Sequence, residues 1–143
     1  MFSRFAAACL MLLAGVAGAQ ARDTTPSPSV ALLLADYAKR YDMPETLLRR
    51  IVMQESGFNP AARHGPYWGL MQLRLDTARG VGYRGTGAGL LDPDTNLTYG
   101  AAYLANAWRV SGGHEGRAMS LYRGGYYYEA KRRRLLDKLI RVP

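Results

Sequence analysis

The chain has 143 residues and carries 19 Lys and Arg against 11 Asp and Glu, a formal net charge of +8. This length corresponds to one domain, and the positive charge predicts an anionic partner. Cys9 is the only cysteine, which excludes an intrachain disulfide, so packing alone has to hold the fold. The sequence contains no metal-ligand cluster and no phosphate-binding glycine motif between a strand and a helix, so we expect neither a metal nor a cofactor.

Residues 1–19 have the pattern of a secretory signal peptide. Arg4 precedes an apolar run that ends in the small-residue pattern Ala17-Gly18-Ala19. A membrane span needs about 20 apolar residues, so this run is too short to be one. We expect no stable membrane insertion once the signal peptide has been cleaved. A lipoprotein anchor at Cys9 is disfavoured because this cysteine lies inside the apolar run. We therefore expect a periplasmic or secreted protein. Outside the cytoplasm, intracellular nucleic acid is not the expected partner.

Residues 20–29 contain Pro26 and Pro28 and are expected to form a linker to a single domain over 30–143. Apolar residues in that domain recur at three- and four-residue spacing, and no run alternates for long enough to predict a sheet. The expected fold class is therefore all-α (mainly α). Caps, prolines and glycines predict helices over 30–41, 44–56, 69–79, from Asp94 or Thr95 to Val110, 115–123 and 127–141.

The last of these expected helices contains the basic run Lys131-Arg132-Arg133-Arg134. Leucines and an isoleucine follow it, so we interpret the segment as an amphipathic helix with a solvated basic face. The alternative is electrostatic attachment to an anionic wall or membrane.

Glu55 lies where an apolar residue is expected. At about 100° per residue, its position falls on the buried face of the 44–56 helix, beside Leu48 and Ile51. Burial disfavours an ionised carboxylate, and the negative end of the helix dipole acts in the same direction. Both effects predict a glutamic acid that keeps its proton near neutral pH, as a general acid must. A structural ion pair with an arginine such as Arg63 is the alternative.

The residues around and after Glu55 form an ordered set of motifs. Together they resemble the lytic transglycosylase domain of the soluble type, which is related to goose-type lysozyme, over about residues 33–125. The motifs that carry the resemblance are Glu55-Ser56-Gly57-Phe58-Asn59-Pro60, Gly69-Leu70-Met71-Gln72-Leu73, Asp92-Pro93, Asn96-Leu97, Gly100, Tyr103-Leu104 and Ser120-Leu121-Tyr122.

This resemblance implies a compact, lysozyme-like helical domain with a groove for peptidoglycan glycan strands. It implies cleavage of the β-1,4 bond between N-acetylmuramic acid and N-acetylglucosamine, with formation of 1,6-anhydromuramic acid. Glu55 is then the single catalytic residue, and Ser56, Met71, Gln72 and Tyr122 are the expected substrate-binding residues. We expect a monomer that remodels the wall locally, with components of a secretion or pilus machine as further partners.

Two departures from the family pattern affect the expected site. Arg123 follows Tyr122 where the family usually has asparagine, and the segment over 61–68 is about one residue shorter than usual. Three alternatives stay open at this point. One is a muramidase that uses water, with Asp76 or Asp92 as its base; another is a non-catalytic peptidoglycan-binding module, which Arg123 favours. The third is a basic nucleic-acid adaptor, which the signal peptide disfavours.

Overall fold

Helices make up most of residues 25–143, the part of the chain that the computed structural model describes. The mainly α fold class is thereby confirmed, and the expected signal peptide lies outside the described residues. The helices are α1 (Pro28–Arg40), α2 (Glu45–Ser56), α3 (Leu75–Gly80), η1 (Ala88–Leu91), α4 (Pro93–Ser111), α5 (Glu115–Gly124), α6 (Tyr127–Arg132) and η2 (Leu136–Lys138). The strands are β1 (Arg63–His64), β2 (Tyr67–Trp68) and β3 (Leu73–Arg74). No helix within 25–143 is both long and apolar enough to cross a membrane.

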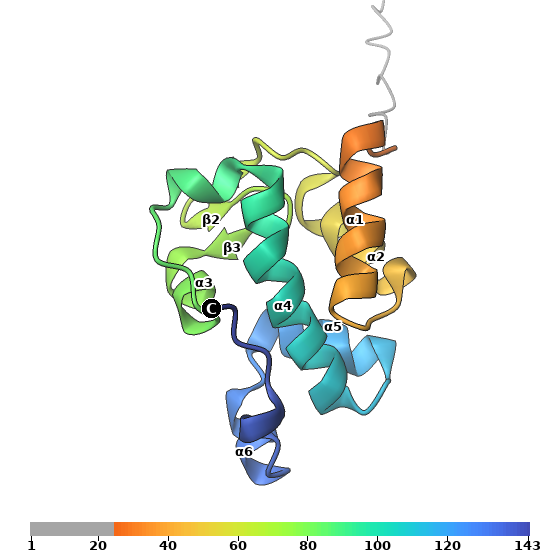
Figure 1. Cartoon of the computed structure of the whole chain (residues 1–143), viewed down its shortest axis with the longest axis vertical. Helices are drawn as coiled ribbons and strands as arrows, with labels where there is room; N and C mark the ends of the chain where they lie inside the picture. The colour runs from red at the N-terminus through yellow and green to blue at the C-terminus, as the bar shows by residue number, and fades with distance from the viewer. Residues whose placement is uncertain (1–24) are drawn as a thin grey trace, which may run out of the picture.

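Helix α4 runs through the middle of the molecule and packs against α1, α5 and η1 (Figure 1). It begins with Asp92, whose carboxylate accepts a hydrogen bond from the Thr95 backbone N–H at 2.8 Å. The expected cap at Asp94 or Thr95 is thus wrong by two or three residues. Gly112 ends the helix in the left-handed conformation, with φ of 69°.

Local signals place the two N-terminal helices close to their expected limits. Helix α1 begins after Ser27, whose hydroxyl accepts from the Val30 N–H, so the first two residues of this helix lie within 20–29, where we expected a linker. Helix α2 begins after Pro44 and ends at Gly57, which has a φ of 58°. This end leaves Glu55 in the last turn, as predicted.

The expected helix over 69–79 is wrong in its first half. Gly69 and Gln72 have φ values of 69° and 48°, and the Gln72 N–H donates to the Gly69 carbonyl at 3.1 Å. These residues form a tight turn between β2 and β3, and helix α3 starts only at Leu75. The side chain of Asn96 from α4 holds this turn by accepting from the Met71 N–H at 2.9 Å. A contact between distant parts of the chain therefore overrides the local helical pattern.

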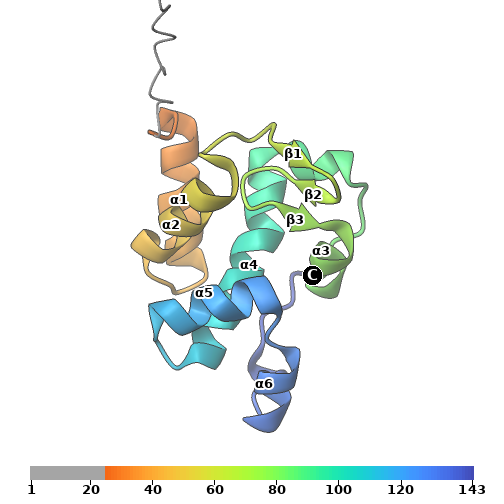
Figure 2. The same ribbon diagram turned by 180° about the vertical axis from the view of Figure 1, so that it is seen from behind.

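Three antiparallel strands of two residues each form the small sheet in the order β1-β2-β3 (Figure 2). Strands this short contain no apolar–polar alternation to read, which is why the sequence predicts no sheet. The sheet lies across α4 from α1 and α2, and its last strand leads into α3 (Figures 1 and 2).

The expected helix over 127–141 ends at Arg132, because the chain turns at Arg134, which has a φ of 56°. The basic run therefore lies at a bend and not along one helical face. The chain then returns beside α3, where the Val142 N–H donates to the Val81 carbonyl at 2.9 Å (Figure 1). Helix α6 and η2 project from the body as a result.

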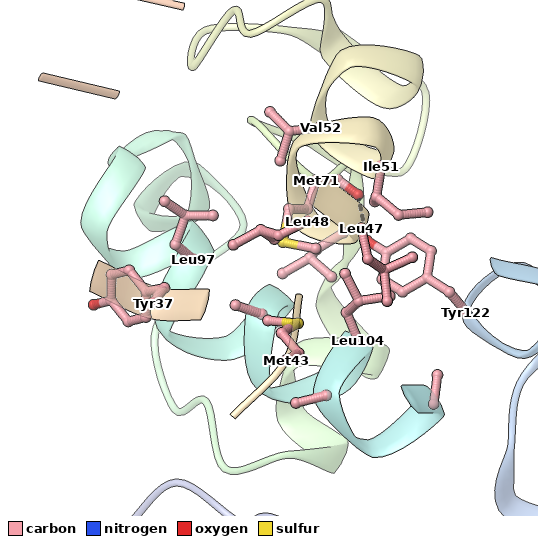
Figure 3. Packing of buried hydrophobic residues seen from close by; sticks show 14 of the residues in the cluster. Tyr37, Met43, Leu47, Leu48, Ile51, Val52, Met71, Leu97, Leu104 and Tyr122 are labelled. Carbon is pink, nitrogen blue, oxygen red and sulfur yellow. Dashed lines mark hydrogen bonds between the residues drawn. The ribbon is translucent and has the colours of Figure 1, made fainter. Parts of the chain in front are cut away.

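The hydrophobic core lies between α1, α2, α4 and the 69–72 turn. Figure 3 shows its largest members pointing toward one another, and Leu48, Ile51, Met71 and Leu104 are each 0% exposed. Burying one such side chain stabilises the fold by about 1.5–3 kcal/mol. The core fixes the ends of α2 and α5, the helices that carry Glu55 and Tyr122.

Candidate active site

Glu55 lies in the wall of a cavity of about 510 Å³ that is open to solvent. Its side chain is 24% exposed, so the carboxyl reaches the cavity from a largely buried position. Side chains from the sheet, the 69–72 turn, α3, α4 and α5 complete the wall; they are Tyr67, Gln72, Leu73, Arg74, Thr77, Tyr103, Tyr122 and Arg123. Four separate parts of the chain, at residues 55, 67–77, 103 and 122–123, therefore enclose one acidic group.

Burial raises the pKa of Glu55 above its usual value, and the positive charge of Arg123 lowers it by a smaller amount. Arg123 Nε lies 4.0 Å from Glu55 Oε1, while its Nη2 donates to Gln54 Oε1 at 2.5 Å. Arg63, the expected alternative partner, instead stacks over the Trp68 ring at 3.2 Å from its centroid. The carboxyl is thus shifted toward its protonated form, and its charged neighbour comes from α5.

Among the described residues 25–143, Glu55 is the only carboxylic acid that lines this cavity. Asp92 caps α4 through its bond to Thr95, and it is absent from the cavity wall. Asp76 is 72% exposed, bonds Arg74 at 3.2 Å and also lies outside this wall. Neither aspartate faces Glu55 across the cavity, where a hydrolytic glycosidase would place its second carboxylate.

Gln72 is held in place by bonds to the surrounding backbone. Its Nε2 donates to the carbonyls of Gly69 at 2.9 Å and Ala62 at 3.2 Å, and its Oε1 bonds His64 Nδ1 at 2.9 Å. His64 thereby helps to orient Gln72. Gln72 lines the cavity, while both the nitrogen and the oxygen of its side-chain amide form hydrogen bonds within the protein.

Met71 and Ser56 do not line the cavity wall. The Met71 side chain is 0% exposed and packs in the core, and the Ser56 hydroxyl donates to the Val52 carbonyl at 3.1 Å. Their side chains therefore support the structure next to Glu55, and their contacts with substrate stay a prediction.

Tyr122 connects the 69–72 turn to helix α5. Its buried hydroxyl donates to the Met71 carbonyl at 2.7 Å, the dashed bond in Figure 3, and its ring lies 5.5 Å from that of Tyr103. Burial raises the pKa of Tyr122 well above its usual value, so the phenol stays protonated. The hydroxyl proton is thus donated to the Met71 backbone carbonyl, and the role of Tyr122 in substrate binding stays a prediction.

Comparison with known proteins identifies the domain that contains this cavity. The family model of the transglycosylase SLT domain matches residues 33–136. The chain belongs to the transglycosylase SLT domain family. This match confirms the resemblance carried by the motifs around Glu55, together with the lysozyme-like, mainly α fold expected from it.

Part of this SLT domain also aligns with curated relatives. Over 76 residues it is 38% identical to the proteins named membrane-bound lytic murein transglycosylase C of Cronobacter sakazakii, Salmonella typhi and Salmonella typhimurium. The alignment covers 48% of this chain and 21% of each relative. The chain therefore matches about a fifth of the length of these proteins.

Six residues of the SLT domain's cavity wall are not among the predicted site residues; they are Tyr67, Leu73, Arg74, Thr77, Tyr103 and Arg123. Arg74 and Thr77 follow the Gly69–Leu73 motif, and Tyr103 stands inside the Tyr103-Leu104 motif. Tyr103 could have been identified from sequence as a cavity residue, because it is a large polar ring next to a core leucine on α4. Arg74 and Thr77 carry no such signal, because only the turn at 69–72 brings them to the cavity.

Proposed function

We propose that this chain is a peptidoglycan lytic transglycosylase in which Glu55 serves first as acid and then as base. The observation that supports this most directly is a single, largely buried carboxyl in an open cavity. Its raised pKa suits proton donation, and the part of the wall that the structure describes contains no second carboxylic acid to activate water.

The proposed reaction needs no other reactant than the glycan. Protonated Glu55 gives its proton to the glycosidic oxygen, and the bond from that oxygen to C1 of N-acetylmuramic acid breaks. The 6-hydroxyl of the same sugar forms a new bond to C1, and its proton returns to the Glu55 carboxylate. The products are a 1,6-anhydro end and a free 4-hydroxyl, and the enzyme regains its starting protonation state.

The remaining cavity residues support substrate binding in this proposal. Arg74 and Arg123 provide positive charge beside Glu55, which suits a glycan whose muramic acid carries carboxylate-bearing substituents. Gln72 and Tyr122 line the path of the strand, while Met71 and Ser56 hold the surrounding backbone. The expected signal peptide would deliver the enzyme to the wall, where we propose that it acts locally, for example beside a secretion or pilus machine.

The chemical form of the product tests this proposal. Purified peptidoglycan digested by the chain is expected to yield fragments that end in 1,6-anhydromuramic acid, lighter by one water than the hydrolytic product in mass spectrometry. Fragments with a reducing muramic acid end would instead establish the muramidase alternative. Binding to peptidoglycan without any released fragment would establish the non-catalytic module.

Replacing Arg123 with Gln is expected to shift the alkaline limb of the pH–rate profile to higher pH. Arg123 lowers the pKa of Glu55, so its loss raises that pKa further and keeps the acid protonated at higher pH. Among the described residues, the other titratable groups of the cavity wall include no second carboxylic acid; they are Arg74, Tyr67, Tyr103 and Tyr122. The measurement is kcat/KM for wall digestion across pH.

Arg117→Gln is the matched control for this shift. Arg117 lies on the same helix with 51% exposure against 53% for Arg123, and it pairs with Glu129, away from the cavity. Its profile should coincide with that of the parent chain. An unchanged alkaline limb in Arg123→Gln would show that this guanidinium does not influence the acid.

A further inference from the structure

Residues 127–141 form an arm that projects from the body of the domain. The arm contains α6, the bend at Arg134 and η2, and it points away from the sheet and from α1 (Figures 1 and 2). The basic run at 131–134 belongs to this arm, and none of the arm's residues lines the Glu55 cavity. The reaction proposed for that cavity therefore does not use the arm.

Several hydrogen bonds to α4 hold the arm in place. Asn106 Nδ2 donates to the Tyr126 hydroxyl at 3.0 Å, directly before the arm, and Asn106 Oδ1 accepts from the Ile140 N–H at 2.6 Å, near the end of the arm. Between these two points, the Arg133 guanidinium donates to the Val110 carbonyl. The arm therefore has a defined shape, and a ligand that binds to it does not have to order it first.

Large hydrophobic side chains are exposed on this arm. Tyr128 is 83% exposed and Tyr127 is 55% exposed, and their rings lie 5.3 Å apart in an edge-to-face arrangement. Leu136 on η2 is 38% exposed and borders the same cavity as Tyr127, so the two side chains lie close together. Three of the six large hydrophobic side chains that are exposed within 25–143 thus lie on the arm. Such a concentration of apolar surface indicates an interaction site.

Positive charge gathers on the same arm. Residues 127–141 contain six Lys and Arg against two Asp and Glu, a net charge of +4, whereas residues 25–126 contain eleven against eight, a net charge of +3. One of the two acids, Glu129, pairs with Arg117 at 2.7 Å and with Arg132 at 2.6 Å. The side chains of Lys131 and Arg134 are exposed and form no ion pair within 25–143. This charge favours an anionic partner.

Helix α6 places the two kinds of side chain on one face. Tyr127 and Lys131 are four residues apart, and so are Tyr128 and Arg132, so each tyrosine ring lies one turn from a basic side chain. The opposite face contains Ala130, which is 0% exposed. The exposed face of α6 therefore combines tyrosine rings with long basic side chains.

A bilayer surface that contains anionic phospholipids complements this combination. Its phosphates attract Lys and Arg, and the apolar stems of these side chains can lie against the acyl chains while their charges stay at the phosphates. Tyrosine rings are enriched at the boundary between headgroups and acyl chains. An acidic polymer supplies the negative charge without the apolar boundary, so it would leave the Tyr128 and Leu136 side chains in water.

We propose that the arm binds the surface of a membrane that contains anionic phospholipids, through the exposed face of α6 and the adjoining bend. The attachment is peripheral: the tyrosine rings reach the boundary below the headgroups, and the basic side chains contact the phosphates. The proposal does not depend on the reaction at Glu55, because the arm and the Glu55 cavity share no residue.

Co-sedimentation with lipid vesicles tests the proposal. The chain is expected to bind at least about tenfold more tightly to vesicles in which about a third of the phosphatidylcholine is replaced by phosphatidylglycerol than to vesicles of phosphatidylcholine alone. Residues 5–18 are apolar in the parent chain and in every variant. The neutral vesicles therefore measure what this run contributes, and the differences among the variants report the arm.

Removing two charges tests the basic part of the arm. Lys131→Gln combined with Arg134→Gln should weaken binding to the anionic vesicles at least about tenfold, since one basic residue near such a surface contributes about fivefold. Lys39→Gln combined with Arg84→Gln is the matched control. It removes one lysine and one arginine that are also exposed and form no ion pair within 25–143, but that lie outside the arm. The affinity of this control should stay within about twofold of the parent's.

Removing the rings tests the apolar part of the arm without a change in net charge. Tyr127→Ser combined with Tyr128→Ser should weaken binding to the anionic vesicles several-fold. Leu32→Ser is the control, because Leu32 is 74% exposed and lies on α1, outside the arm, and it should bind like the parent. All of these positions are exposed, so the circular dichroism spectra of the variants should match that of the parent.

Any of four results would overturn the proposal. They are no gain in affinity from phosphatidylglycerol, equal losses in the two charge variants, unchanged binding after removal of the two rings, or a loss of binding to lipid-free peptidoglycan or to a DNA oligonucleotide as large as the loss for vesicles. The last result would assign the arm to a wall polymer or to nucleic acid. Digestion of peptidoglycan by the parent chain is measured separately, and its failure would refute the proposed function alone.

Discussion

Replacing Glu55 with Gln is expected to slow wall digestion about 10²- to 10⁴-fold, the usual contribution of a general acid–base group. Glutamine keeps the shape of the side chain but cannot donate or accept the proton that the reaction transfers. The measurement is the initial rate of fragment release from purified peptidoglycan. Retention of more than about a tenth of the parent rate would be incompatible with the assigned role.

The stability of this variant separates lost chemistry from lost structure. Burial raises the pKa of Glu55 in the folded chain, so ionisation near pH 7 destabilises the fold relative to the unfolded chain. A neutral glutamine removes that effect, and the free energy of unfolding should not fall. Glu45→Gln is the matched control: Glu45 lies on the same helix, pairs with Arg49 at 2.6 Å and is outside the cavity, so digestion should be unchanged.

Replacing Asn96 with Ala is expected to lower the free energy of unfolding by about 3–5 kcal/mol. This side chain is 0% exposed and accepts from the Met71 N–H at 2.9 Å; it also donates to the carbonyls of Trp68 and Leu90, each at 2.8 Å. Alanine leaves three backbone groups without their partner, and each such group costs about 1–3 kcal/mol when buried. The loss is large against a typical total of about 5–15 kcal/mol.

Urea unfolding followed by circular dichroism measures this difference, with Asn59→Ala as the control. Asn59 also bonds a backbone N–H, that of Ala61 at 3.0 Å, but it does so at an exposed position where water can replace it. The control should lose less than about 1 kcal/mol. Similar losses in both variants would mean that Asn96 does not hold the turn between β2 and β3.

The sequence alone determined the features that depend on neighbouring residues. Gly57 and Gly112 end their helices because glycine adopts the left-handed conformation without steric cost, as the chain pattern indicates. Helical periodicity placed Glu55 on the buried face of its helix, and the motifs around it identified the family. Each of these features can be predicted from the spacing of residues within one element or from the order of motifs along the chain.

Only the tertiary structure decided the features that depend on distant contacts. Asn96 holds the Gly69–Gln72 segment in a turn, and Asn106 fixes the C-terminal segment against α4 through its bond to the Ile140 N–H. The packing of α5 beside α2 brings Arg123, and not Arg63, to Glu55. The physical reason is the same in each case. A polar or charged side chain forms its hydrogen bond or ion pair with a group that folding brings near it, and the spacing of residues along the sequence does not indicate which group that is.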